Sequence, residues 1–100
     1  MRVLLIDDCK NLGNPDIIAR NYNSGIEALT KLGPWDCLLL DHDLDSFDEN
    51  GYEFTGTNIM NFLIENIEYA PKEIRCVSQN PIGYKKINLL INDLKKIRGF

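Results

Sequence analysis

Short apolar runs alternate along the chain with stretches in which apolar residues recur every three or four positions. The runs are short and mostly apolar, which is typical of strands that are buried on both faces of a sheet. The spacing of three and four is typical of helices that bury one face. The predicted strands cover residues 2–7, 17–21, 36–41 and 73–77. Helices are expected after the second, third and fourth of these strands.

Capping residues indicate where the predicted helices begin and end. Ser24 and Glu27 have the spacing of a capping box, and Gly33 ends the first helix. The second helix is expected to begin after Thr55 or Thr57. The apolar face of the second helix would consist of Ile59, Leu63 and Ile67, and that of the last helix of Ile87, Leu90, Ile91, Leu94 and Ile97.

This alternation of strands and helices predicts an α/β fold with a small parallel sheet and helices on both faces. One hundred residues suit one core, so we expect a single domain over residues 1–100. The expected strand order is 2-1-3-4. In such sheets ligands bind outside the carboxyl ends of the strands, near the switch point between the first and third strands. The polar segment 45–56 contains glycine and is expected to be a loop over these strand ends.

Polar side chains follow the predicted strands at the points where they end. Asp7 and Asp8 end the first strand, Asp41 ends the third, and Ser78 and Asn80 follow the fourth. Because parallel strands share one carboxyl edge, all of them are expected along one rim of the sheet. Carboxylates repel each other, so such a cluster requires a cation, a shared proton or a basic neighbour.

The types of side chain at this rim suit a metal site and phosphate chemistry. Asp7, Asp8 and Asp41 offer only oxygen ligands, which Mg²⁺ or Mn²⁺ accepts, and the alternative is that they cap loops or helices. His42 has the acid–base range to act as a general acid or base on a phosphodiester, with Asp41 beside it. The alternative role for His42 is a structural hydrogen bond that fixes the acidic loop.

A phosphate group has further candidate ligands. Ser78 and Asn80 precede the last helix, whose free amides can hold an anion. The alternative is an ordinary cap by Asn80 in front of Pro81, and both roles are compatible. Arg20, in the second strand, can reach a phosphate or lie on the surface as an ordinary charged residue.

The composition of the chain argues against several classes of protein. The net charge of −4 argues against general nucleic-acid binding, which needs a basic face. No apolar run approaches the ~20 residues of a membrane span. A strand is predicted directly after Met1, so no signal peptide is expected. Three widely spaced cysteines are most simply reduced thiols of a cytoplasmic protein.

The acid pair, Asp41 and Ser78 together resemble the site of a response-regulator receiver domain. In that family the acids hold Mg²⁺, the aspartate of the third strand accepts a phosphoryl group, and the serine contacts it. Two features differ here. About nine residues join the first two strands, whereas a connection with a crossover helix needs ~10–12 residues or more. No fifth strand that ends in lysine is predicted.

Both features are similar to a compact receiver-like family, the cyclic-phosphate processing receiver domains. The resemblance covers roughly residues 2–94. It includes a short first loop, a Leu-Asp-His-Asp-Leu motif, and an arginine in the second strand. The matching positions are Asp7-Asp8, Arg20, Leu40 to Leu44, Thr55-Gly56 and Ser78 to Gly83. The histidine that the family carries before this serine is Val77 here.

The resemblance implies a domain that binds a divalent metal and a small nucleotide with a cyclic phosphate, and that hydrolyses the phosphodiester. With Val77 in place of the second histidine, acid–base chemistry would rest on His42 alone. The alternatives are a non-catalytic module that sequesters the nucleotide, a switch phosphorylated on Asp41, and a protein-interaction module, such as one encoded by a phage, whose partner the sequence does not name.

Overall fold

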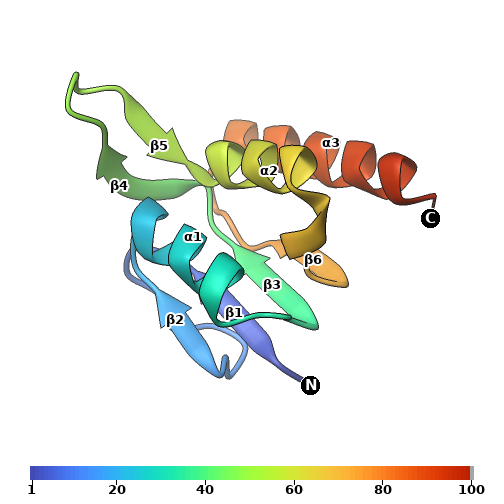
Figure 1. Cartoon of the computed structure of the whole chain (residues 1–100). Helices are drawn as coiled ribbons and strands as arrows, with labels where there is room; N and C mark the ends of the chain where they lie inside the picture. The colour runs from blue at the N-terminus through green and yellow to red at the C-terminus, as the bar shows by residue number, and fades with distance from the viewer. Residues whose placement is uncertain (100) are drawn as a thin grey trace.

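The structure of the protein is a computed structural model, and residues 1–99 are described. It confirms the α/β class. The central sheet is parallel and contains β1 (Val3–Ile6), β2 (Ile17–Ala19), β3 (Cys37–Leu40) and β6 (Glu73–Cys76). The order across the sheet is β2-β1-β3-β6, which is the expected order 2-1-3-4 with β6 as the fourth strand (Figure 1). The helices are α1 (Tyr22–Lys31), α2 (Gly56–Glu65) and α3 (Pro81–Arg98). This is a receiver- or flavodoxin-like arrangement.

The three helices share a single core on one face of the sheet. In β1, Leu4 and Ile6 belong to this core, whereas Leu5 is fully buried but lies outside it. Side chains alternate between the faces of a strand, so Leu5 points to the opposite face. The other core residues are Ala19, Ala28, Leu29, Trp35, Leu38, Leu40, Leu44, Ile59, Met60, Leu63, Ile74, Ile87, Ile91 and Leu94.

Helices were expected on both faces, and here the arrangement is more one-sided. A right-handed crossover between β1 and β2 would place its helix on the second face, but the short segment 7–16 forms a loop without a helix. This loop lies against the second face: Gly13 approaches Leu39 so closely that a Cβ at Gly13 would be 2.5 Å from a Leu39 methyl carbon. None of the helices within residues 1–99 is long and apolar enough to cross a membrane.

Helix α1 begins earlier than predicted. Its N-cap is Asn21, whose side chain accepts from the Ser24 backbone amide at 2.8 Å, while the Ser24 hydroxyl accepts from the Asn21 amide at 3.2 Å. Ser24 therefore closes the capping box from inside the helix, and its assignment as the cap was wrong. The asparagine three residues upstream offers an equally good cap and lengthens the helix by almost one turn.

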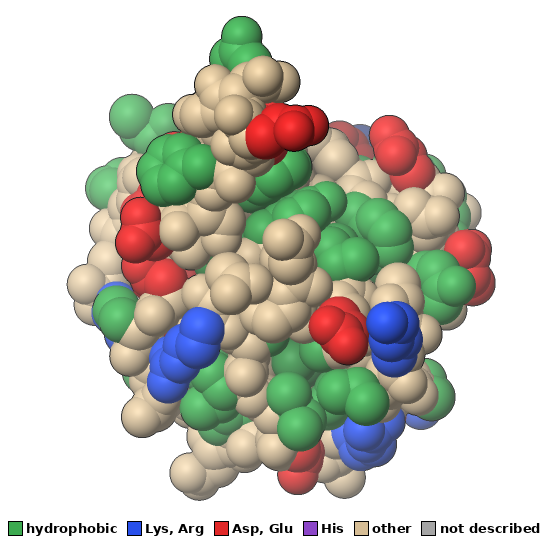
Figure 2. Space-filling model, turned by 60° about the vertical axis from the view of Figure 1, so that its left-hand side comes forward, with side chains coloured by type: hydrophobic (Ala, Val, Ile, Leu, Met, Phe, Trp, Pro, Cys, Tyr) green, Lys and Arg blue, Asp and Glu red, His purple; other side chains and the backbone are tan. Residues whose placement is uncertain are grey.

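The predicted loop 45–56 is largely a β-hairpin. Strands β4 (Asp43–Phe47) and β5 (Glu53–Thr55) pair in antiparallel fashion and project from the body of the molecule (Figures 1 and 2). The Asp48 carboxylate accepts from the amides of Asn50 and Tyr52 and organises the turn. The hairpin carries few apolar residues, which explains why the pattern predicted a loop. A 3-10 helix, η1 (Ile67–Tyr69), connects α2 with β6.

Candidate functional site

The sheet itself positions two carboxylates at its carboxyl edge. Asp7 directly follows β1 and Asp41 directly follows β3, and the two side chains are buried, with 0% and 8% of the residue exposed. Their amides continue the strand ladders: Asp7 donates to the Ala19 carbonyl at 3.1 Å and Asp41 to the Ile6 carbonyl at 2.9 Å. Both carboxylates are therefore fixed by backbone that is hydrogen bonded in the sheet.

One oxygen of Asp7 is buried and has no partner. The Oδ1 atom of Asp7 accepts from the amides of Cys9 at 3.1 Å and Lys10 at 3.0 Å. The Oδ2 atom forms no hydrogen bond with any of the described residues. A buried carboxylate oxygen without a partner is unfavourable, because it has lost its hydration and gained nothing in return. Asp7 Oδ2 therefore marks a point at which a cation or a proton would be stabilised.

Asp41 is held in a strongly negative environment. Burial and the neighbouring charge of Asp7 raise the pKa of the Asp41 carboxyl, and Asp8 adds to the rise. Hydrogen bonds from the His42 amide, at 2.9 Å, and from the Ser78 side chain oppose it. The net rise means that burial and the like charges outweigh these hydrogen bonds, and added positive charge would favour the ionised form of Asp41.

Asp7, Asp8 and Cys9 form the tightest group of possible ligands in the described part of the chain. One ligand atom of each lies within 4.8 Å of the others, and Asp41 is outside this group. Partial desolvation and the charges of Asp8 and Asp7 raise the pKa of the Cys9 thiol, which stays protonated at neutral pH. The hard oxygen ligands are therefore the better donors. Cys9 was not among the predicted site residues, and only its position after the acid pair pointed to it.

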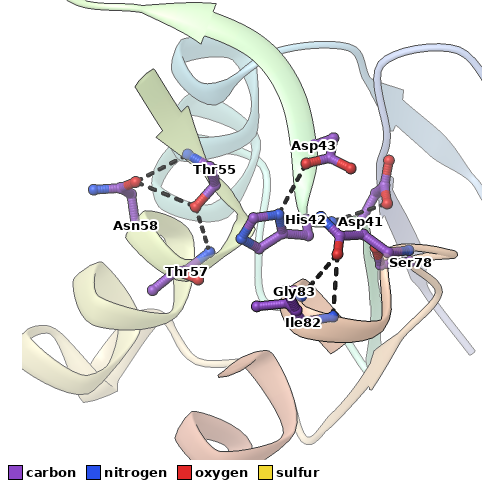
Figure 3. Close-up of polar contacts among 10 residues, drawn as sticks. Asp41, His42, Asp43, Thr55, Thr57, Asn58, Ser78, Ile82 and Gly83 are labelled. Atoms are coloured by element: carbon purple, nitrogen blue, oxygen red, sulfur yellow. Dashed lines mark hydrogen bonds and ion pairs between the residues drawn. The ribbon is translucent and has the colours of Figure 1, made fainter. Parts of the chain in front are cut away.

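His42 lies beside these acids, and one of its ring nitrogens is held by Asp43. Its Nδ1 atom is 2.9 Å from Asp43 Oδ1, and its side chain is 14% exposed (Figure 3). The Nε2 atom forms no hydrogen bond within residues 1–99. Figure 3 places the segment of Thr55 and Thr57 on this side of the ring. The hydroxyl of Thr57 is buried and also lacks a partner among the described residues.

Two glycines permit the close packing around this histidine. A Cβ at Gly83 would lie 2.3 Å from the Cγ atom of His42, and a Cβ at Gly56 would lie 2.3 Å from the Asp41 carbonyl oxygen. Both distances are far too short for any side chain. Gly56 opens α2 and Gly83 lies in the first turn of α3, so both helices begin directly against the motif that contains Asp41 and His42.

Asn80 and Ser78 are engaged with the start of α3. The Asn80 side-chain oxygen accepts from the amides of Ile82 at 3.1 Å and Gly83 at 3.2 Å, and Pro81 occupies the first position of the helix. The Ser78 hydroxyl oxygen accepts from the Asn80 amide at 3.1 Å. The capping role of Asn80 is therefore present, and its side-chain NH₂ group is the part that can still contact a ligand.

Arg20 holds the loop at residues 7–16, here called the acid loop, which carries Asp7 and Asp8. One guanidinium nitrogen donates to the carbonyl oxygens of Lys10 at 2.7 Å and Asp7 at 3.3 Å, and the other donates to the Asn11 side chain. The structure thus brings Asp7, Asp8, Asp41, His42 and Ser78 to the same rim, with Asn80 at the start of α3. It places Arg20 beneath the acid loop, where its contacts shape that loop.

Comparison with known protein families found a match over most of the chain. The family model described as the cyclic-phosphate processing receiver domain matches residues 2–93. No curated protein and no solved structure matches significantly. The matched range includes every strand of the central sheet, the acid loop and most of α3. The chain therefore belongs to the family of cyclic-phosphate processing receiver domains.

Proposed function

We propose that this domain binds a divalent cation, Mg²⁺ or Mn²⁺, through Asp7, Asp8 and Asp41, together with a nucleotide that carries a cyclic phosphate. The observation that carries the proposal is the buried, unpartnered Oδ2 atom of Asp7, next to an Asp41 whose pKa is raised by burial and by Asp7 itself. A cation between these groups would satisfy the orphaned oxygen and remove the repulsion.

The donor set fits a hard cation. The three carboxylates supply oxygen only, and the protonated Cys9 thiol is a poor ligand for such an ion. When bound, the cation supplies positive charge to a phosphate oxygen at the rim. The chain's own part is to hold the acids rigidly, through the strand ladders and through the contacts of Arg20 with the acid loop.

His42 is the proposed acid–base residue for hydrolysis of the phosphodiester. Asp43 accepts a hydrogen bond from Nδ1–H, which leaves Nε2 as the proton acceptor of the neutral ring. Figure 3 shows Nε2 directed toward the segment of Thr55 and Thr57 and away from Asp41, so the ligand would have to extend from the acids to that side of the ring. Asp43 would thereby position the ring and select its tautomer. Ser78 and the NH₂ group of Asn80 would orient the phosphate, and the unpartnered Thr57 hydroxyl is a further donor on the Nε2 side.

A second candidate function is binding without hydrolysis. It is favoured by Val77, which stands where the family carries a second histidine before Ser78. With one imidazole in place of two, the domain would hold the cyclic nucleotide and release it intact.

The two functions are separated by incubating the protein with 2′,3′-cyclic nucleotides and cyclic dinucleotides in Mg²⁺ or Mn²⁺ and following the ligand by ³¹P NMR. Hydrolysis is expected to fall by about 10²–10⁴-fold in His42→Gln. The exposed Glu68→Gln is the control, because it lies outside the site. Tight binding in calorimetry with the ligand recovered intact would identify a sequestering module. Neither binding nor turnover with any of these ligands would reject both functions.

A further inference from the structure

Strand β6 forms an open edge of the central sheet (Figure 1). Its inner side pairs with β3, and within residues 1–99 no strand pairs with its outer side. The amides of Glu73 and Val77 donate inward, to Asp36 at 3.0 Å and to Leu40 at 2.9 Å. Backbone groups alternate in direction along a strand, so the amides and carbonyls of Ile74 and Cys76 point outward. An open row of this kind is a template for another strand.

The exposed side chains of β6 have a self-complementary charge pattern. Glu73 and Arg75 are two positions apart and exposed, so they project from the same face of the strand. Within the chain they already form an ion pair, with 3.0 Å between Arg75 Nη2 and Glu73 Oε1. Ile74 lies between them and points to the core.

We propose that β6 pairs in antiparallel fashion with β6 of a second copy of this chain, about a two-fold axis at Ile74. Ile74 would exchange both backbone hydrogen bonds with its own equivalent, because its amide and carbonyl point outward. Glu73 would then lie directly opposite Arg75 of the second copy, and Arg75 opposite the second Glu73. The two sheets would become one continuous sheet, with alternating charges across the junction.

The basic groove beside β6 favours this antiparallel arrangement over a parallel one. A groove of about 330 Å³ between β6 and α3 has an apolar floor, and the cations Lys72, Lys95 and Arg98 line it with Glu73. Lys72 immediately precedes β6, so the cations cluster near the amino end of the strand. Antiparallel pairing sets the amino ends of the two copies at opposite ends of the junction and keeps their cations apart.

Sedimentation velocity over a range of protein concentrations tests the pairing. The wild-type chain is expected to shift from monomer to dimer as concentration rises. Arg75→Glu places like charges opposite each other at both symmetric positions and should weaken the dimer by about tenfold or more. The double variant Glu73→Arg/Arg75→Glu restores opposite charges at both positions and should restore the dimer.

Lys31→Glu is the matched control. It also removes an exposed ion pair, with Glu27 at 3.8 Å, and changes the net charge by the same amount, but it lies on α1. It should dimerise like the wild type. Hydrogen exchange gives an independent measure: the amides of Ile74 and Cys76 should slow at high concentration in the wild type and not in Arg75→Glu.

Three outcomes would overturn the proposal. The first is a wild-type chain that stays monomeric at high concentration, which would point to an acidic extended peptide as the occupant of this edge. The second is a dimer that Arg75→Glu leaves unchanged, because the copies would then meet elsewhere. The third is a folded double variant, verified by its thermal unfolding, that fails to recover the dimer.

Discussion

At the scale of single residues, the rim brings Asp7 and Asp41 together, and within residues 1–99 neither carboxylate forms an ion pair with a lysine or arginine. The nearby Arg20 directs its guanidinium to backbone carbonyls and to Asn11, and His42 is turned toward Asp43. The acids are thus held in place by backbone structure while their charges repel. This repulsion is the cost that the proposed cation site would place on the stability of the free protein.

Asp41→Asn is expected to stabilise the protein when metal is removed by a chelator. The pKa of the Asp41 carboxyl is raised in the folded state above its ordinary value of 3.8. As pH rises from 3.8 through the folded-state pKa, ionisation of Asp41 therefore lowers the free energy of unfolding. The gain in Tm should be present at pH 7 and disappear below 3.8, where the carboxyl is protonated in both states. A gain of ~1 kcal/mol corresponds to ~4–8 °C.

Thermal unfolding between pH 3 and pH 8 measures this difference, with Glu49→Gln on the exposed hairpin turn as control. A lower Tm for Asp41→Asn at neutral pH would contradict the repulsion inferred here.

Gly83→Ala is expected to destabilise the protein by about 1–3 kcal/mol and to abolish any activity that depends on His42, because the new methyl group overlaps the histidine. Helix propensity alone would predict that Gly83→Ala stabilises the protein, since alanine is more favourable than glycine in a helix by ~1 kcal/mol. Urea unfolding measures the change. The loss should shrink in a His42→Gly background, and equal losses in both backgrounds would exclude this contact as the cause.

The positions of the rim acids could be predicted from sequence, because an apolar strand that ends in aspartate fixes where that aspartate lies. The partner of His42 could not. Asp43 is the next residue, and in a continuing strand it would point to the opposite face. The chain instead turns from β3 into β4, and that turn brings the two side chains to 2.9 Å. The contacts of Arg20 could not be predicted either, because they depend on the path of the loop at residues 7–16.

At the scale of elements, α3 begins on a side-chain cap that also borders the site. Asn80→Ala should cost about 1 kcal/mol, because the amides of Ile82 and Gly83 lose their acceptor. Asn80→Asp keeps the acceptor and should keep the stability, but it lacks the NH₂ donor. If Asn80 contacts a phosphate, Asn80→Asp will weaken nucleotide binding in calorimetry while Tm stays close to that of the wild type. If the affinity of Asn80→Asp for the nucleotide is unchanged, Asn80 acts only as the cap of α3.

The β4–β5 hairpin is attached to α1 by an aromatic stack. The rings of Tyr22 and Phe54 lie 4.3 Å apart and 10° from parallel. Phe54→Ala should destabilise the protein by about 1–2 kcal/mol and speed hydrogen exchange in the hairpin more than in the central sheet. Phe47 is 58% exposed, so Phe47→Ala should change little. Equal effects of the two variants would show that the stack does not hold the hairpin.

The sequence pattern predicted the sheet strands and helices well and failed at the hairpin. Strands of the central sheet are recognisable because both faces are covered, which requires apolar runs. In the hairpin, Leu44 is buried while Asp43 and Asp45 are exposed, so its strands lack such runs. Its stability comes from contacts with distant residues, such as Tyr22, that no local pattern records.

At the scale of the whole molecule, binding of a cation at the rim should stabilise the fold. A ligand that binds only the folded state raises the free energy of unfolding by about 2.7 kcal/mol at ~100 times its Kd. Tm should therefore rise with the logarithm of Mg²⁺ or Mn²⁺ concentration. Asp7→Asn should remove the dependence, and Glu68→Gln should retain it. A Tm that does not respond to either ion would reject the cation site.

The one-sided packing of the helices gives the loop at residues 7–16 two tasks. It carries Asp7 and Asp8, and it also lies over the strand face on which Leu39 meets Gly13. A deletion in this loop would expose that face, and an insertion would move the acids, so its length is constrained from both directions. Attempts to redesign ligand specificity should leave this loop intact and graft new segments onto the exposed hairpin turn at residues 49–51.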